Sequence, residues 1–222
     1  NGQTVPLHSF DGRLYPPVTL SAQAPASYRF VGWKTKNAIN VGTGRTLVPA
    51  QSEWKYSDAG PVASNWRYRI FSDKNWKEGS APLGYGAHFP VSTTISYGSD
   101  ANNKYPTYYF RKKFQIDEMP DHGEFVLNYT LDDGCVIYVN GVEAGRVHMP
   151  EGAVSYTTYS ATSVATTAAT GSIVMDKSLF KAGENLIAVE VHNTSATSSD
   201  ILWDASLLCV DQVQIEAGGI LS

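Results

Sequence analysis

The sequence predicts an all-β protein: a β-sandwich of jelly-roll topology with a small N-terminal β appendage. The 222 residues include 13 Tyr, 5 Trp and 8 Phe beside 19 Gly and 11 Pro, a composition rich in strand and turn formers. Several segments alternate apolar and polar residues with a period of two, as half-buried strands do. Strand and helix patterns do not alternate along the chain, which argues against a parallel sheet. Many short strands joined by turns favour a jelly roll at this length.

We expect residues 1–45 to form a small segment and residues 46–222 the main domain. The stretch "PVTLSAQAPASYRFVGW" has strand-like runs interrupted by Pro25. It resembles one copy of a short β-repeat of bacterial cell-surface proteins, although Ser27 stands where that repeat has glycine. The matching residues are Tyr28, Phe30, Gly32 and Trp33. A segment this short buries little surface alone, so it must pack on a neighbour.

The clearest strand and hairpin signals lie in the middle of the chain. "EFVLNYTL" alternates strictly, and its apolar face is Phe125, Leu127, Tyr129 and Leu131. In "CVIYVNGVEAGR", Asn140-Gly141 supplies the positive φ angles of a two-residue type I′ hairpin. Two later segments, "NLIAVEVHN" and "DILWDASLLCV", predict core strands, with apolar residues at every second position. Those residues are Ile187, Val189 and Val191 in the first, and Ile201, Trp203, Ala205, Leu207 and Cys209 in the second.

Helical signals are confined to two short pieces, "DKNWKEG" and "DKSLFKAG", each stopped by a glycine. The uncharged stretch "SYTTYSATSVATTAATGS" is compatible with an edge strand or a long loop. Cys135 and Cys209 lack the spacing of a metal site, and both fall at apolar strand positions. We therefore expect two buried free thiols, with a single disulfide as the alternative.

Charge and hydropathy exclude two classes of partner. A net charge of −4 with 17% charged residues gives no basic surface for nucleic acid. No stretch approaches the length of apolar sequence that spans a bilayer, so we expect no membrane insertion. The chain begins at Asn1 without a signal peptide, which predicts a processed form or a piece of a longer protein.

Six ordered motifs between about Leu47 and Leu208 resemble a galactose-binding-like jelly-roll module of large secreted bacterial proteins. They are "LVPAQSEWKY", "NWKEGSAPLGYG", "TTISYG", "YYFRKKFQI", "LDDGCVIYVNGVEAGRVHMPEG" and "GENLIAVEVHNTSATSSDILWDASL". The region is also similar to the non-catalytic N-terminal sugar-binding domain of family 2 glycoside hydrolases. That domain has an aromatic-Arg-x-x-Phe strand, a Val-Asn-Gly hairpin and a Gly-x-Asn-x-x-x-Val strand. The resemblance implies a secreted or cell-surface location, and a role in carbohydrate binding, adhesion or domain spacing.

The adjacent acids Asp132 and Asp133 have two interpretations. One is structural: Asp133 caps the turn, and Gly134 takes a conformation that other residues resist. In the other, a carboxylate accepts hydrogen bonds from sugar hydroxyls. The resemblance implies that an acid near Asp132 and the hairpin Asn140 reach a ligand, although the turn alone explains Asn140. A structural calcium ion is a further hypothesis for the acids and for the oxygen-rich loop "GSDANNKY", but neither has the spacing of a known calcium loop.

Glu190 and His192 lie two residues apart on one predicted strand and therefore share a face. A carboxylate beside an imidazole could perform acid-base chemistry, but a hydrogen-bonded pair on a solvated face is the commoner arrangement. No nucleophile elbow or phosphate loop accompanies the pair, so we predict no catalytic residue. Among the aromatic residues, Trp54, Trp76 and Trp203 are expected in the core. Trp66, in a predicted loop, is the candidate platform for a sugar ring.

These observations lead to three hypotheses. The first is a non-catalytic, secreted or surface-attached module that binds carbohydrate through loops at one end of the sandwich, near Asp132 and Asn140. The second is a structural or adhesion spacer without a small ligand, whose partners are neighbouring domains. The third is an enzyme built on Glu190 and His192, which has the least support. The sequence predicts no cofactor beyond the calcium hypothesis.

Overall fold

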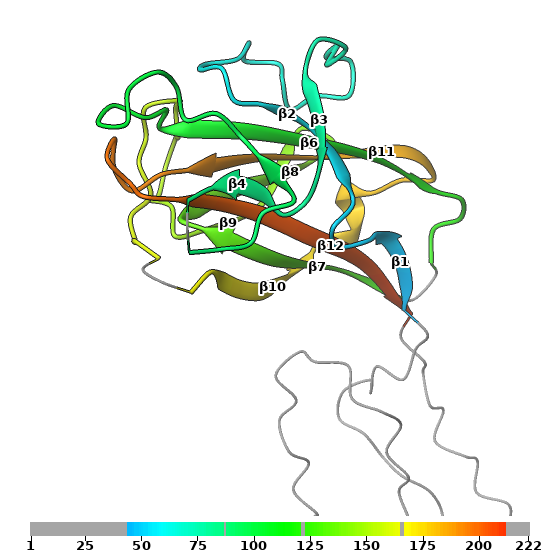
Figure 1. Cartoon of the computed structure of the whole chain (residues 1–222). Coiled ribbons are helices and arrows are strands. Elements are labelled where there is room, and N and C mark those ends of the chain that lie inside the picture. The colour runs from blue at the N-terminus through cyan, green and yellow to red at the C-terminus, as the bar shows by residue number, and fades with distance from the viewer. Residues whose placement is uncertain (1–43, 87, 121–122, 165–166, 212–222) are drawn as a thin grey trace, which may run out of the picture.

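The computed structural model describes residues 44–86, 88–120, 123–164 and 167–211, which form two mainly antiparallel sheets packed face to face (Figure 1). Sheet A has the order β10-β7-β12-β4-β5, with β1 also paired to β12. Sheet B has the order β3-β2-β6-β11-β8-β9. The strands of sheet A are β1 (Arg45–Val48), β4 (Leu83–Tyr85), β5 (Thr93–Thr94), β7 (Gly123–Asp132), β10 (Ala169–Met175) and β12 (Ile201–Asp211). Those of sheet B are β2 (Glu53–Ser57), β3 (Lys77–Ser80), β6 (Thr107–Ile116), β8 (Gly134–Val139), β9 (Val142–Val147) and β11 (Gly183–His192).

From β6 onward the chain passes repeatedly between the sheets, so that β6 and β8 lie in sheet B with β7 between them in sheet A. The same alternation recurs in β10, β11 and β12. This confirms the predicted all-β jelly-roll sandwich. Within the described residues, the single helical turn is the 3₁₀ turn η1 (Lys177–Leu179), in the second segment where the sequence predicts one.

The main core lies between the sheets and contains the apolar faces predicted for β7, β11 and β12. At its centre, the rings of Trp54 and Trp203 pack edge to face, with centroids 5.8 Å apart. Cys135 and Cys209 are buried there as free thiols, as the sequence predicts. Among the described residues, no helix has the length and apolar character needed to cross a membrane.

Three local predictions from the sequence have different outcomes in the structure. The segment "DKNWKEG" is wrong as a helix: it is a turn that leads directly into β3, because Lys77–Ser80 pairs with β2. The Ser- and Thr-rich stretch contains a loop and then the edge strand β10, so both interpretations hold for different parts of it. The surface-repeat motif lies outside the described residues, and the division at residue 45 stays a prediction.

The outer face of sheet B is covered by two loops, residues 58–76 and 148–164. Side chains from these loops pack on the outer face of β6, β8 and β11 and form a second apolar cluster. Its buried members are Trp66, Tyr109, Val136, Tyr138, Leu186 and Ala188. β11 is consequently buried on both faces, which a two-layer sandwich does not require.

The predicted site residues are divided between the two ends of the sandwich. Asp133 precedes β8 and Asn140 follows it, so the strand separates them by about 20 Å at 3.3 Å per residue. At the Asp133 end, the loops before β6, after β9 and between β11 and β12 gather on the left of Figure 1. The hypothesis that Asp132 and Asn140 form one site is therefore wrong, because β8 is interposed.

Candidate functional site

Asp133 is a buried anchor for two loops. Its Oδ1 accepts a hydrogen bond from the backbone N–H of Val164 at 2.9 Å. Its Oδ2 accepts from the backbone N–H of Thr194 at 2.9 Å and from the hydroxyls of Thr194 and Ser198 at 3.1 and 3.2 Å. The residue is 1% exposed, so its carboxylate is engaged inside the protein and presents no surface to a ligand. The bonds reach distant loops rather than the local turn, which corrects the turn-cap interpretation.

Gly134 is required for space and not for its backbone angle. A Cβ at this position would lie 2.6 Å from Ser160 Oγ and 2.9 Å from Met149 Sδ. The φ angle of Gly134 is not positive, so another residue could adopt its backbone conformation. The glycine therefore lets the loop after β9 approach the start of β8.

Asp132, its neighbour, is fully buried but has a different environment. Among the described residues, no group is placed to hydrogen-bond either carboxylate oxygen. Burial, followed by the negative charges of Asp133 and Asp200, raises the pKa of the Asp132 carboxyl from its ordinary 3.8 to about 8. Asp200 is itself buried and lies 2.6 Å from Nδ1 of His88. At neutral pH Asp132 is therefore mostly neutral, and it does not offer an ionised carboxylate to a sugar.

We expect this pKa to make stability depend on pH. Below pH 8 the folded state holds a proton on Asp132 that the unfolded chain loses above about pH 4. The free energy of unfolding should consequently fall as the pH rises from about 4 to about 8, by about 6 kcal/mol at most. In Asp132→Asn this slope should be largely absent, as measured by urea unfolding at intervals of one pH unit. A wild-type slope retained in the variant would contradict the assignment.

Glu190 and His192 lie beneath the loops on the outer face of sheet B, and the expectation of a solvated face is wrong. They are 5% and 0% exposed. Nδ1 of His192 lies 2.7 Å from the carbonyl oxygen of Thr158, which can only accept, so Nδ1 carries the proton. Glu190 Oε1 accepts from the Tyr138 hydroxyl at 2.6 Å, and its Oε2 is 3.6 Å from His192 Nε2. The pair is therefore enclosed by protein.

Trp66 is not an exposed platform. Its ring is 6% exposed and packs edge-on against Tyr109 and Tyr138, with centroid distances of 4.8 and 5.8 Å. Trp66 is a buried member of the second apolar cluster, so burial of its apolar surface against sheet B accounts for its inward position. In the same loop, two and four residues after Trp66, Tyr68 is 41% exposed and Ile70 is 89% exposed. Sequence reasoning missed both, although an isoleucine next to an arginine in a predicted loop is a signal that could have drawn attention to them.

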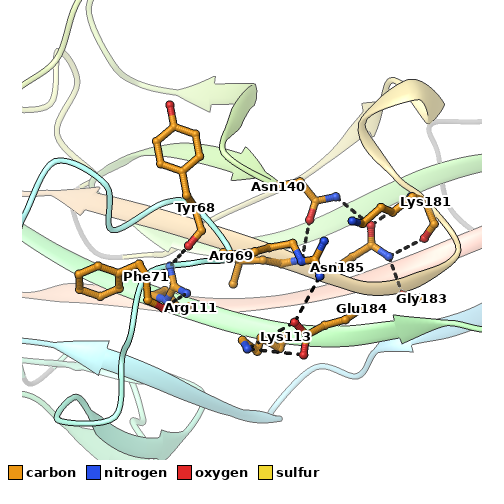
Figure 2. A network of polar contacts seen from close by, with 11 residues as sticks. Tyr68, Arg69, Phe71, Arg111, Lys113, Asn140, Lys181, Gly183, Glu184 and Asn185 are labelled. Carbon is orange, nitrogen blue, oxygen red and sulfur yellow. Dashed lines mark hydrogen bonds and ion pairs between the residues drawn. The ribbon is translucent and has the colours of Figure 1, made fainter.

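Arg111 holds the loop that carries these residues. This β6 side chain is 1% exposed, and its Nε donates to Asp73 Oδ2 at 2.8 Å. Its other nitrogens donate to backbone carbonyl oxygens of the same loop, and the acceptors are Trp66, Tyr68 and Phe71. A single guanidinium thus fixes residues 66–73 from the side of the sheet, and Figure 2 shows it below Tyr68 and beside Phe71. In the sequence, Arg111 is the arginine of the aromatic-Arg-x-x-Phe motif.

The candidate functional site is a cavity between loop 58–76 and the η1 segment. It has a volume of about 390 Å³. Its lining consists of Tyr68, Arg69, Ile70, Asn140, Ser178, Leu179, Phe180 and Lys181. In Figure 2 the Tyr68 ring projects away from the sheets, while Arg69 lies over β11. The cavity combines an exposed aromatic ring, apolar groups and two cations, a composition suited to a small ligand.

Asn140 lies at the cavity, but its amide is engaged within the protein. Its Nδ2 donates to Leu179 O and to Asn185 Oδ1, both at 2.8 Å, and its Oδ1 accepts from Leu186 N at 3.0 Å. Its φ of 52° and that of Gly141, 96°, confirm the predicted type I′ hairpin. Asn185 is fully buried and in turn accepts from Lys181 N and donates to Lys181 O. The two asparagines therefore shape one wall of the cavity.

A metal centre is not visible among the described side chains: no three His, Cys, Asp or Glu residues come together as a group that could hold an ion. In the "GSDANNKY" loop, Asp100 Oδ1 accepts from Asn102 N at 2.8 Å, an ordinary turn contact. The calcium hypothesis stays a prediction.

Comparisons with known proteins identify the fold. No family model and no curated protein matches the sequence. Among solved structures, a Bacteroides uniformis β-glucuronidase superposes with a TM-score of 0.52 at 14% identity over 76% of this chain. A β-glycosidase from Bacteroides vulgatus gives 0.51 at 16% identity over 75%. A family 2 glycosyl hydrolase from Bacteroides cellulosilyticus gives 0.50 at 18% identity over 75%.

The shared feature is a β-sandwich domain. This confirms the fold expected from the resemblance to family 2 glycoside hydrolases. The chain spans only 18%, 20% and 21% of the three enzymes, respectively. At these identities the likeness concerns the fold alone, and the function has to be argued from the site.

Proposed function

We propose that this chain is a non-catalytic carbohydrate-binding module of a larger secreted or cell-surface protein. The observation that carries the proposal is the cavity beside Tyr68. Its volume of about 390 Å³ falls within the ~300–1,000 Å³ of small-molecule sites. The half-exposed Tyr68 ring offers a flat apolar face for a sugar ring, and Ser178 and Lys181 offer polar groups for its hydroxyls.

The cavity favours binding over hydrolysis. Glycoside hydrolysis ordinarily uses a pair of carboxyl groups that flank the scissile bond. The residues that line the cavity include no Asp or Glu. The adjacent acids Asp132 and Asp133 are both buried at the other end of β8. The module therefore lacks a carboxylate pair at its candidate site, and any hydrolysis by the full protein is assigned to another part of it.

The test is a glycan array followed by calorimetry with the ligands it identifies. Tyr68→Ala should weaken binding about tenfold, since loss of an aromatic stacking face costs on the order of 1 kcal/mol. Its backbone carbonyl, which Arg111 needs, is retained in this variant. Tyr159→Ala is the matched control, because Tyr159 is 38% exposed on the loop after β9 and does not line the cavity. If both variants lose the same amount of binding affinity, the carbohydrate site does not lie at the cavity.

A structural or adhesion spacer is the second candidate function. The observation that favours it is Ile70, an apolar side chain that is 89% exposed at the tip of a rigidly held loop. Such a residue suits contact with a neighbouring domain. If no glycan on the array binds, the carbohydrate proposal fails and the spacer function gains support.

A further inference from the structure

The charge of the cavity differs from that of the whole chain. The chain has a net charge of −4, yet the cavity lining contains Arg69 and Lys181 and no acid. Glu184, the nearest acid that contacts either cation, lies outside the lining and is shared between Arg69 and Lys113, at 3.7 and 3.4 Å. An anionic ligand would therefore meet a local excess of positive charge in a protein that otherwise repels it.

Lys181 is held by its backbone while its ammonium group remains available. The buried Asn185 side chain binds Lys181 N at 3.1 Å and Lys181 O at 2.7 Å. Asn185 is fixed in turn by Asn140 and by Gly183 O, at 2.8 and 2.9 Å. Within the described part of the chain, the Lys181 ammonium has no hydrogen bond or ion pair, and the residue is exposed. Figure 2 shows this network in one view.

Arg69 is positioned in a comparable way from the opposite wall. The carbonyls of Tyr68 and Phe71, on either side of it, accept from the buried Arg111. Its side chain is about one-third exposed, and its closest acid contact is the 3.7 Å approach to Glu184. That distance is too long for a good charge-assisted hydrogen bond. The planar guanidinium thus retains donors for a carboxylate or sulfate.

The geometry points to an anionic saccharide as the ligand of this cavity: a pyranose whose carboxylate or sulfate group lies between Arg69 and Lys181 while its ring contacts Tyr68. This inference rests on the proposed carbohydrate-binding function and specifies its ligand class. Both cations and the ring stand on segments that buried polar side chains hold in place, so little ordering is needed on binding.

The experiment compares matched acidic and neutral sugars by calorimetry. The probes are an oligogalacturonide and its fully methyl-esterified form, and chondroitin sulfate and desulfated chondroitin. We expect at least one acidic probe to bind tenfold or more tightly than its matched neutral or desulfated form in 20 mM salt, with the advantage reduced at 200 mM. The galacturonide and chondroitin pairs distinguish a carboxylate from a sulfate ester.

Two charge variants locate the effect. Lys181→Gln and Arg69→Gln should each remove most of the acidic preference. Lys74→Gln changes the net charge equally at an exposed position outside the lining and should leave the preference intact. An equal loss in Lys74→Gln would overturn the site assignment, because only long-range charge would then be at work.

The two proposals fail in distinguishable ways. If the neutral sugars bind as tightly as the acidic ones, the anionic specificity is wrong while carbohydrate binding stands. If no saccharide binds, both proposals fall.

Discussion

Arg111→Met should destabilise the protein by about 3 kcal/mol, because it removes one partner of a buried ion pair and the donor to three carbonyls. Methionine keeps most of the side-chain volume, so the loss reports on polar contacts rather than on a cavity. Loop 58–76 should lose its order, and protease cleavage should appear within it. Urea unfolding and limited proteolysis measure the two effects.

Lys113→Met is the matched control for this variant. Lys113 points to the same side of β6, two residues further on, but its side chain is 46% exposed and its pair with Glu184 is 3.4 Å long. Such a surface pair contributes about 0–1 kcal/mol. If both variants unfold at the same urea concentration, Arg111 does not hold the loop.

Asp133→Asn should destabilise the protein by about 3 kcal/mol, which corresponds to a fall in melting temperature of about 6–12 °C. The amide keeps one acceptor oxygen and turns an NH₂ group toward donors. The donors at this site are the N–H groups of Val164 and Thr194 and the hydroxyls of Thr194 and Ser198. At least one buried donor is then left without a partner.

Asp132→Asn provides the internal comparison for this prediction. The two acids are adjacent and both buried, but the carboxylate of Asp132 has no hydrogen-bond partner in the part of the chain that the structure describes. At pH 7 its replacement should be neutral or stabilising, since burial of an unpaired acid is unfavourable. Thermal unfolding should therefore show a loss of stability in Asp133→Asn and no loss in Asp132→Asn. A similar loss in both would show that burial alone, and not the hydrogen bonds of Asp133, decides the outcome.

The strand pattern and the hairpin were predictable because they depend on local chemistry. Alternation of period two marks β7, β11 and β12, since side chains on a strand point to opposite faces in turn. Asn140 and Gly141 predict the hairpin because few other residue pairs accept two positive φ angles. The covering of the outer face of sheet B by loops 58–76 and 148–164 was not predictable, since the apolar residues of these irregular loops follow no regular spacing.

The candidate site was largely hidden in the sequence. Its lining joins residues 68–70 with residues 178–181, more than one hundred positions apart, and only Asn140 was expected there. The other expected residues have conspicuous chemistry but are buried: Trp66 by the second cluster, and Glu190 and His192 by the loops. Chemistry can be read from a residue type, whereas exposure depends on the segments that pack over it.

The sequence by itself determined the fold class and the β8–β9 hairpin, because each follows from residues that are close in the chain. Only the tertiary structure decided which polar residues meet solvent. Asp133 and Arg111 are similar to any surface acid or base in the sequence, but long-range hydrogen bonds make them internal anchors. Those bonds join segments at least thirty residues apart, and local pattern carries no information over that distance.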